Sequence, residues 1–135
     1  MKKKKILFIS QEITYLEENE LGRFGRFLPQ GIQEDGKEIR TFMPKFGCIN
    51  ERRNQLHEVI RLSGMNLIIN ENDHPLIIKV GSIQAARMQV YFIDNEDYFK
   101  RKATLTDEDG NLFDDNDERA IFFAKGVIET VKKLN

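Results

Sequence analysis

The order of elements in residues 6–31 constrains the fold of this chain more than any other feature. An apolar run, Ile6 to Ser10, is followed by a polar loop. Apolar residues then recur every three or four positions, at Leu21, Phe24, Leu28 and Ile32. The run is typical of a parallel strand covered on both faces, and the recurrence predicts an amphipathic helix. Because ligands in such α/β sheets bind beyond the carboxyl ends of strands, any chemistry is expected in the loop from Gln11 to Glu20.

The ends of this helix and the strand that follows it can also be predicted. Asn19 is suited to cap the start of the helix, and Gly36 is placed to end it in a left-handed conformation. Pro29 lies inside the helix and predicts a kink or a break. The next strand spans residues 39–43 and is closed by Pro44. Together these elements form a β-α-β unit with a short crossover.

The middle of the chain has a different character. Four short β-like runs occupy residues 57–62, 67–69, 75–80 and 88–93, and turn residues separate them at Gly64, residues 70–73 and Gly81. No long helical pattern intervenes, so part of this section is expected to be antiparallel. The last run is apolar enough to return to the main sheet. The predicted fold is therefore α/β: a Rossmann-like, mostly parallel sheet flanked by helices, with an antiparallel β insertion.

The C-terminal third is predicted to be mainly helical around an acidic loop. Residues 96–101 suggest a short helix, and residues 104–114 form an acidic, turn-rich loop that lacks the ligand order of an EF-hand calcium site. Asp115 and Glu118 have the spacing of a capping box at the start of the last helix. The predicted buried stripe of that helix is Ala120, Phe123, Ala124, Val127, Val131 and Leu134.

Composition excludes several classes of function. The 135 residues suffice for one domain, and 21 basic against 22 acidic residues create no field that would attract nucleic acid or a membrane. Lys2–Lys5 are predicted to be a solvated lead-in to the first strand. The single cysteine, Cys48, excludes an internal disulfide, and His57 and His74 share no metal-ligand spacing. We therefore expect a soluble, cytoplasmic protein with no cofactor, no metal and no transmembrane segment.

Five segments in this order resemble the amino-terminal domain of the bacterial glycogen synthase and plant starch synthase family, which transfers glucose from ADP-glucose. They are residues 6–12, Leu28-Pro29, residues 39–47, residues 90–99 and the stretch 115–123, which is similar to an Asp-Asn-x-x-Arg-Phe helix start. The resemblance implies the GT-B architecture and a role in glycogen biosynthesis. It covers nearly the whole chain as one domain, 1–135. Family members continue into a strand with a His-x-His-type motif and a second domain, so this chain alone is expected to be inactive.

In this family the first loop carries a Lys-x-Gly-Gly-Leu signature that contacts the phosphates of the nucleotide. Counting back from Leu28-Pro29, Glu17 takes the place of the lysine, while Asn19 and Glu20 take the places of the glycines. A carboxylate repels a diphosphate, and side chains at the glycine positions block close approach. A tighter alignment would instead bring Arg23 or Arg26 toward the phosphates. The candidate substrate loop comprises Gln11, Glu12, Glu17, Asn19, Glu20, Leu21 and Gly22.

Two interpretations remain open for other residues that the resemblance singles out. Glu12 either lines a sugar pocket or anchors the loop. The candidate sugar contacts are Tyr98, Asp115, Asn116 and Arg119. The alternative is that Tyr98 packs in the core and that the other three form a helix cap and an ion pair. No catalytic residue is assigned.

Three hypotheses for function follow. The first is a glycogen synthase-like glucosyltransferase domain with ADP-glucose or α-glucan as candidate ligands. The second is a non-catalytic glucan-binding, sugar-nucleotide-binding or regulatory module that acts through a partner domain or a second copy at an exposed sheet edge. The third is a Rossmann-like domain unrelated to sugar transfer.

Overall fold

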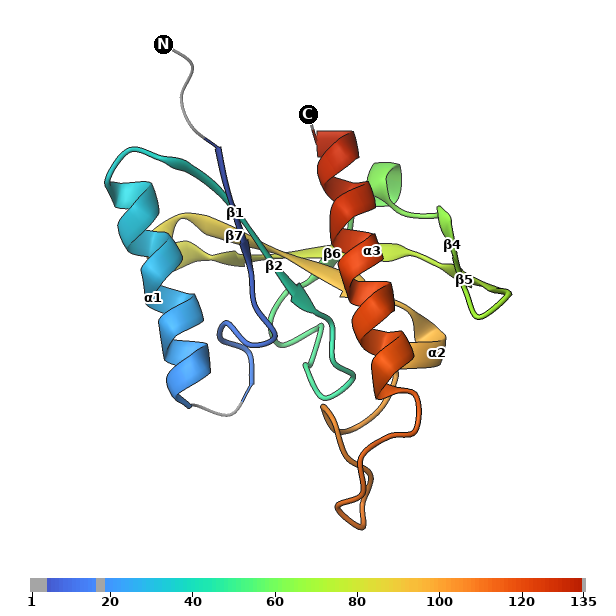
Figure 1. The fold of residues 1–135 in the computed structure, drawn as a ribbon. Coiled ribbons are helices and arrows are strands. Elements are labelled where there is room, and N and C mark those ends of the chain that lie inside the picture. Colours follow the sequence, from blue (N-terminus) through green and yellow to red (C-terminus); the bar gives the residue numbers. More distant parts are fainter. Residues whose placement is uncertain (1–4, 17–18, 135) are drawn as a thin grey trace.

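The structure is a computed structural model that describes residues 5–16 and 19–134. Helices pack against a twisted central sheet, and a separate hairpin lies beside the C-terminal helix (Figure 1). The strands are β1 (Lys5–Ile9), β2 (Glu38–Pro44), β3 (His57–Glu58), β4 (Asn66–Ile69), β5 (Asn72–Pro75), β6 (Ile77–Ile83) and β7 (Met88–Asp94). The helices are α1 (Glu20–Glu34), α2 (Glu96–Phe99) and α3 (Asn116–Leu134), with short 3-10 turns at Ile60–Leu62 and Gln84–Ala86.

The central sheet has the strand order β1-β2-β7-β6-β3. β1 pairs with β2 and β2 pairs with β7 in parallel, whereas β6 pairs with β7 and β3 pairs with β6 in antiparallel fashion. β4 and β5 form their own two-stranded sheet. The predicted α/β class, the parallel β-α-β opening, the return of residues 88–93 to the main sheet and the antiparallel insertion are all confirmed.

Helices α1 and α3 cover opposite faces of the sheet. Successive side chains of a strand point to opposite faces of the sheet, so Leu7 and Phe8 of β1 lie on different faces. The ring of Phe8 lies 6.4 Å from the ring of Phe24 in α1. Leu7, its neighbour, lines a groove with Val131 and Leu134 of α3. Figure 1 shows the sheet passing between the two helices.

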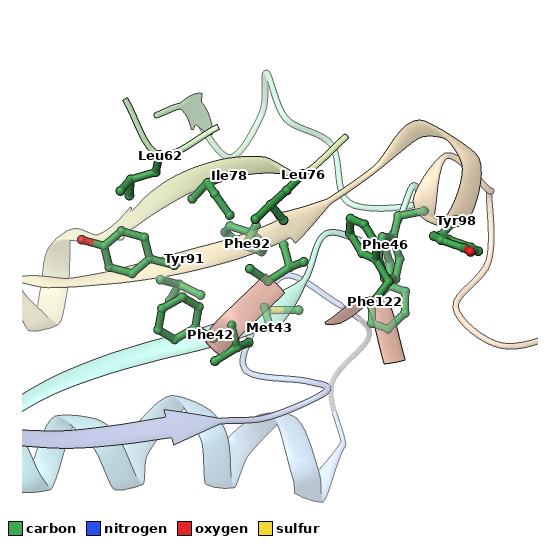
Figure 2. Close-up of a cluster of buried hydrophobic side chains, with 14 of the residues drawn as sticks. Phe42, Met43, Phe46, Leu62, Leu76, Ile78, Tyr91, Phe92, Tyr98 and Phe122 are labelled. Carbon is green, nitrogen blue, oxygen red and sulfur yellow. The ribbon is translucent and has the colours of Figure 1, made fainter. Parts of the chain in front are cut away.

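The core is concentrated on β2, β7 and the inner face of α3 (Figure 2). Phe42, Met43, Phe92, Ile93 and Phe122 have no exposed surface. Burying one such side chain stabilises the fold by about 1.5–3 kcal/mol. α3 approaches closely at Gly126, where a Cβ atom would lie 2.7 Å from Cγ2 of Ile93.

β1 and α1 are more exposed to solvent than the sequence pattern predicted. β1 lies at the edge of the sheet, with Leu7 44% and Ile9 50% exposed, so coverage on both faces was wrong for the described residues. Much of the apolar stripe of α1 is also exposed, because the helix turns the small surface of Gly25 and Pro29 toward the protein. The predicted cap at Asn19 and the left-handed Gly36 are confirmed. A break at Pro29 was wrong, since α1 continues from Glu20 to Glu34.

Three predictions in the middle section also need correction. Residues 57–62 are not one strand, because β3 ends at Glu58 and a 3-10 turn follows. The turn predicted over residues 70–73 is confined to Asn70 and Glu71, which both adopt positive φ, and Asn72 already begins β5. Gly81 is not a turn residue but lies within β6. A Cβ atom there would lie 2.6 Å from the side chain of Leu56, so close packing explains the glycine.

The predicted stripe of α3 is confirmed in part, because Val127 is buried and Phe123, Val131 and Leu134 pack against the core. The buried residues of α3 are Arg119, Phe122, Gly126, Val127 and Thr130, whereas Ala120 and Ala124 are exposed. The predicted capping box at Asp115 is replaced by another contact, because its carboxylate is held by Arg101. Small and polar residues form part of the buried face, and a count of apolar positions cannot identify such a face.

Candidate functional site

The loop after β1 is fixed tightly against α1. The Ser10 hydroxyl donates to the carbonyl of Glu12 at 2.7 Å, and the Glu12 N–H donates back to the Ser10 Oγ at 3.3 Å. Ile13 anchors the loop in the core with 1% of its surface exposed. α1 approaches at Gly25, where a Cβ atom would lie 2.6 Å from the Glu12 carbonyl oxygen. The loop is therefore positioned by the backbone, and Gly25 permits that approach.

Asn19 occupies the N-terminus of α1 with its own side chain. Its Oδ1 accepts the N–H of Gly22 at 2.7 Å, and its Nδ2 donates to the carboxylate of Glu12. The Glu12 side chain therefore links the loop to the start of α1. The N–H of Gly22, a group that would otherwise suit a phosphate oxygen, is already satisfied. Glu20 and Leu21 are exposed in the first turn, and Glu17 lies outside the described residues.

A cavity of about 320 Å³ opens beside this loop. Its lining combines Glu12 and Gly22 with Arg23 and Arg26. Arg26 donates from Nη1 to Gln30 at 2.5 Å, which directs one edge of its guanidinium along the helix. The positive groups that the tighter alignment brought toward the phosphates are therefore close to the loop. The cavity has charges of both signs, unlike a simple phosphate cradle.

A second cavity, of about 190 Å³, lies where β1 and β2 end and α3 begins. Its lining is mostly apolar, and the polar residues among it are Gln11, Asn116 and Arg119. The other lining residues are Pro44, Phe46, Phe99, Leu105, Ala120 and Phe123. Two of the four candidate sugar contacts, Asn116 and Arg119, thus lie together with Gln11 of the candidate loop.

Arg119 is held in a cage of aromatic rings and carbonyl groups. Its Nε donates to the Tyr98 carbonyl at 2.8 Å, and its Nη1 donates to the Thr104 carbonyl and to Asn116 Oδ1, both at 2.7 Å. Its Nη2 is buried with no partner within the described part of the chain. The guanidinium carbon lies 5.9, 5.3 and 5.1 Å from the ring centres of Phe46, Phe99 and Phe113.

This environment affects the pKa of Arg119 and shows which segments its side chain holds together. Burial, with a contribution from nearby Arg101, lowers the pKa of Arg119, although a guanidinium stays protonated in proteins. The cation ties the loop before α3 to the first turn of that helix. This cage could not be predicted from sequence patterns, because its rings come from separate segments of the chain.

Tyr98 and Asp115 do not line either cavity. Tyr98 is 3% exposed, and its hydroxyl lies 3.0 Å from Nε2 of His74, whose Nδ1 lies 3.0 Å from Asp97. Burial, together with nearby carboxylates, raises the pKa of Tyr98. Arg101 donates to both oxygens of Asp115 at 2.5 and 2.6 Å, and this pairing lowers the pKa of Asp115. In this structure Tyr98 packs in the core and Asp115 pairs with Arg101.

Across residues 5–16 and 19–134, no group of three or more His, Cys, Asp or Glu side chains is arranged to hold a metal ion. Cys48 is exposed, and partial desolvation raises the pKa of its thiol, which disfavours the reactive thiolate. None of the described helices is long and apolar enough to span a membrane.

Comparison with known proteins assigns a family to this geometry. A sequence profile described as the starch synthase catalytic domain matches residues 5–135. Glycogen synthases from Chlorobium phaeobacteroides and Chlorobium luteolum are each 39% identical over 132 residues, which is 96% of this chain. The matched region is 27% of each of these relatives, so the chain spans about a quarter of their length.

A solved structure shows the same fold. The catalytic domain of starch synthase IV from Arabidopsis thaliana, bound to ADP and acarbose, superposes with a TM-score of 0.73 over 96% of this chain and 25% of that chain. Its sequence identity is 16%, so it supports the fold alone. The profile match over nearly every residue shows that the chain belongs to the starch synthase catalytic domain family.

Proposed function

We propose that this chain forms one wall of a glucosyltransferase cleft that elongates α-glucan from ADP-glucose in the cytoplasm. The observation that carries the proposal is the position of both cavities, at the carboxyl ends of β1 and β2 and at the first turns of α1 and α3. Parallel α/β sheets bind ligands at this end. The family match and the ADP and acarbose named for the starch synthase IV structure support these ligand classes.

The two cavities suit different parts of the reaction. The cavity beside Arg23 and Arg26 provides the cations that a diphosphate requires. The second cavity offers apolar surface for sugar rings from its more exposed lining residues, Leu105, Ala120 and Phe123. We therefore assign the first cavity to the donor and the second to the glucan.

The described chain binds a diphosphate poorly in this arrangement. The Asn19 side chain occupies the N–H of Gly22, and the Glu12 carboxylate contacts the same asparagine. Each unfavourable group costs about 1.4 kcal/mol, which corresponds to a tenfold loss in affinity. We therefore expect the chain alone to transfer no glucose.

The same observation favours a second candidate function. A domain whose helix N-terminus is closed by its own side chain can retain the glucan cavity while losing donor binding. Such a domain would be a non-catalytic glucan-binding or regulatory module that acts through a partner protein.

Calorimetric titration with ADP and with maltoheptaose separates the two functions. The test variant combines Glu17→Lys, Asn19→Gly and Glu20→Gly, and the control is Glu34→Lys, an exposed carboxylate at the other end of α1. The proposal predicts that the triple variant binds ADP at least about tenfold more tightly than the native chain, and that the control does not. Unchanged ADP binding would refute the donor-site assignment. Maltoheptaose binding without any gain for ADP would support the non-catalytic module.

A further inference from the structure

A cavity of about 470 Å³ lies at the amino ends of β2 and β7. Its walls come from the first residues of these strands, from the turn that joins β6 to β7, and from Gln33 in the last turn of α1. Figure 1 shows that turn beside the end of α1. The donor and glucan cavities lie at the carboxyl ends of β1 and β2, so this cavity is at the opposite end of the parallel strands. The proposed transfer of glucose does not use it.

The lining of this cavity, which we call the β2–β7 cavity, combines positive charge with hydrogen-bonding groups. The cations are Arg40 of β2 and Arg87 in the turn before β7. Ser82 and Tyr91 contribute hydroxyl groups, and three glutamine side chains contribute amides. None of the described residues that line the cavity carries a carboxylate. Its volume is within the range of small-molecule sites, about 300–1,000 Å³. The lining therefore favours a small anion that also carries polar groups.

Arg40 is held over Tyr91 at one side of the cavity. Its Nη1 donates to the Tyr91 hydroxyl at 3.3 Å, and its guanidinium carbon lies 6.0 Å from the ring centre. The Tyr91 ring stacks in turn on Phe42, with 5.3 Å between the ring centres. Glu38 approaches Nη2 of Arg40 only to 3.8 Å, and these two side chains are 39% and 42% exposed. Exposed ion pairs of this kind contribute little, so a ligand anion can compete for Arg40.

Arg87 has a backbone conformation that its residue type does not favour. Its φ of 51° and ψ of 40° lie in the left-handed region, which is unfavourable for residues with a Cβ and usual for glycine. Gln33 fastens this turn to α1, because its Nε2 donates to the carbonyls of Ala86 and Arg87 at 3.2 and 3.4 Å. Over residues 5–16 and 19–134, the guanidinium of Arg87 has no hydrogen bond or ion pair. An unfavourable backbone conformation that places an unpaired cation at a cavity points to a function for that side chain.

Phosphate is the anion that best suits this pair of arginines. A guanidinium presents parallel N–H donors that match two oxygens of a phosphate or a carboxylate. A phosphate monoester carries a charge of about −1.5 to −2 at neutral pH, so it uses two cations, whereas a carboxylate uses one. The nearby hydroxyl and amide groups can bind hydroxyl groups on the organic part of the ester. The carbonyl oxygens of Ala86 and Arg87, which would repel an anion, are already occupied by Gln33.

We propose that the β2–β7 cavity binds a small phosphate ester, whose phosphate group pairs with Arg40 and Arg87 and whose hydroxyl groups contact Ser82 and the glutamine amides. The site is separate from the donor cavity, because the two share no lining residue. A bound ester joins the start of β2, the turn between β6 and β7, and the end of α1. It therefore stabilises the folded chain as its concentration rises. This inference does not depend on the donor and glucan assignments.

Two-dimensional NMR of the ¹⁵N-labelled chain, titrated with ribose 5-phosphate, tests the proposal directly. The amide resonances of Arg40 and of residues 82–91 should shift together, with one dissociation constant. Ribose should cause no such shift, and inorganic phosphate should bind at least about threefold more weakly, because each offers only one part of the ligand. The affinity for ribose 5-phosphate should fall as sodium chloride is added, because salt screens the attraction between the phosphate and the arginines.

Matched variants separate this site from general attraction between charges. Arg87→Asn removes the guanidinium, and asparagine is among the residues that tolerate the left-handed conformation. It should weaken ribose 5-phosphate binding at least about tenfold, without lowering the thermal unfolding midpoint of the ligand-free chain. Arg52→Asn removes the same charge from an exposed residue outside the cavity and should change the affinity by less than about twofold. Arg40→Gln should also weaken binding about tenfold, and it provides the test if Arg87→Asn does not fold.

Three results would overturn the proposal. In the first, ribose 5-phosphate shifts no resonance of residues 82–91 at concentrations up to about 10 mM, which excludes even weak binding. In the second, Arg87→Asn and Arg52→Asn weaken binding equally, which would assign the effect to the overall charge of the chain. In the third, inorganic phosphate binds as tightly as ribose 5-phosphate, which would assign the cavity to free phosphate.

Discussion

Two glycines of α1 provide a test of how the candidate loop is positioned. At Gly25, an added Cβ atom would lie 2.6 Å from the Glu12 carbonyl oxygen and 3.0 Å from the Ile13 Cα. At Gly31, no atom beyond the adjacent residues and the nearby backbone of α1 lies within 4 Å of an added Cβ. Both residues are inside the same helix and neither requires a positive φ. Replacement by alanine therefore brings the same gain in helix propensity at both positions but a steric clash at only one.

The magnitude follows from this difference. Gly31→Ala should raise the free energy of unfolding by about 0.5–1 kcal/mol, the propensity gain of alanine over glycine in a helix. Gly25→Ala has the same gain, but overpacking against backbone atoms costs about 1–3 kcal/mol. The difference between the two variants therefore isolates the steric cost and should equal about 1–3 kcal/mol.

Urea denaturation of the two variants and the native chain, monitored by circular dichroism, measures this difference. The slope of unfolding free energy against urea should be unchanged, so that midpoints report stability directly. Gly25→Ala should also shift the NMR resonances of Glu12 and Ile13, whereas Gly31→Ala should not. Equal stabilisation by both substitutions, within about 0.5 kcal/mol, would show that close approach at Gly25 does not fix the loop.

Two further predictions concern the core and the start of α3. Phe122→Ala should lower the free energy of unfolding by about 3–5 kcal/mol because the ring is fully buried, whereas the control Phe27→Ala, 60% exposed, should change it by less than about 0.5 kcal/mol. Comparable losses in urea denaturation would contradict the assigned burial. Arg101 lowers the pKa of Asp115, so the stabilisation from this pair is complete above the unfolded pKa of about 3.9 and is lost as pH falls through the lower folded value. Asp115→Asn should therefore reduce stability at pH 7 by on the order of 1 kcal/mol and by much less at pH 2 to 3, and a loss independent of pH would refute this interpretation.

The parallel unit of the fold could be predicted because its signals are local. β2 and β7 are apolar runs closed by Pro44 and by Asp94-Asn95, and Asn19 and Gly36 limit α1 by their own conformational preferences. The errors arise where packing against other elements decides whether a residue is buried. An apolar run of residues does not reveal which elements pack against it. Leu7 was therefore expected to be buried, although it lies in an edge strand and is 44% exposed. Gly81 is explained by the distant Leu56 and not by its neighbours in sequence.

The candidate site was predictable to a similar extent. The position of the first loop follows from the β-α-β order, whereas the family alignment placed Glu17 at the cationic position and brought Arg23 or Arg26 there only in a tighter alternative. The contact between Asn19 and Glu12 could not be anticipated, because a capping residue does not reveal what its amide group will bind. Arg119 was named from its motif alone. Its three aromatic neighbours are brought together only by the tertiary fold.

The hairpin of β6 and β7 has a consequence for how this chain folds. The two strands pair over seven residues and are joined by the short turn at Gln84–Ala86. Pairing β1 with β2 instead closes a loop that contains α1, and pairing β2 with β7 closes a loop that contains the whole insertion. Closing a short loop loses less chain entropy than closing a long one. We therefore expect the hairpin to form in the folding nucleus and β1 to join late. Conservative core substitutions in β6 and β7 would then slow folding, while those in β1 would mainly speed unfolding, and stopped-flow kinetics distinguishes the two.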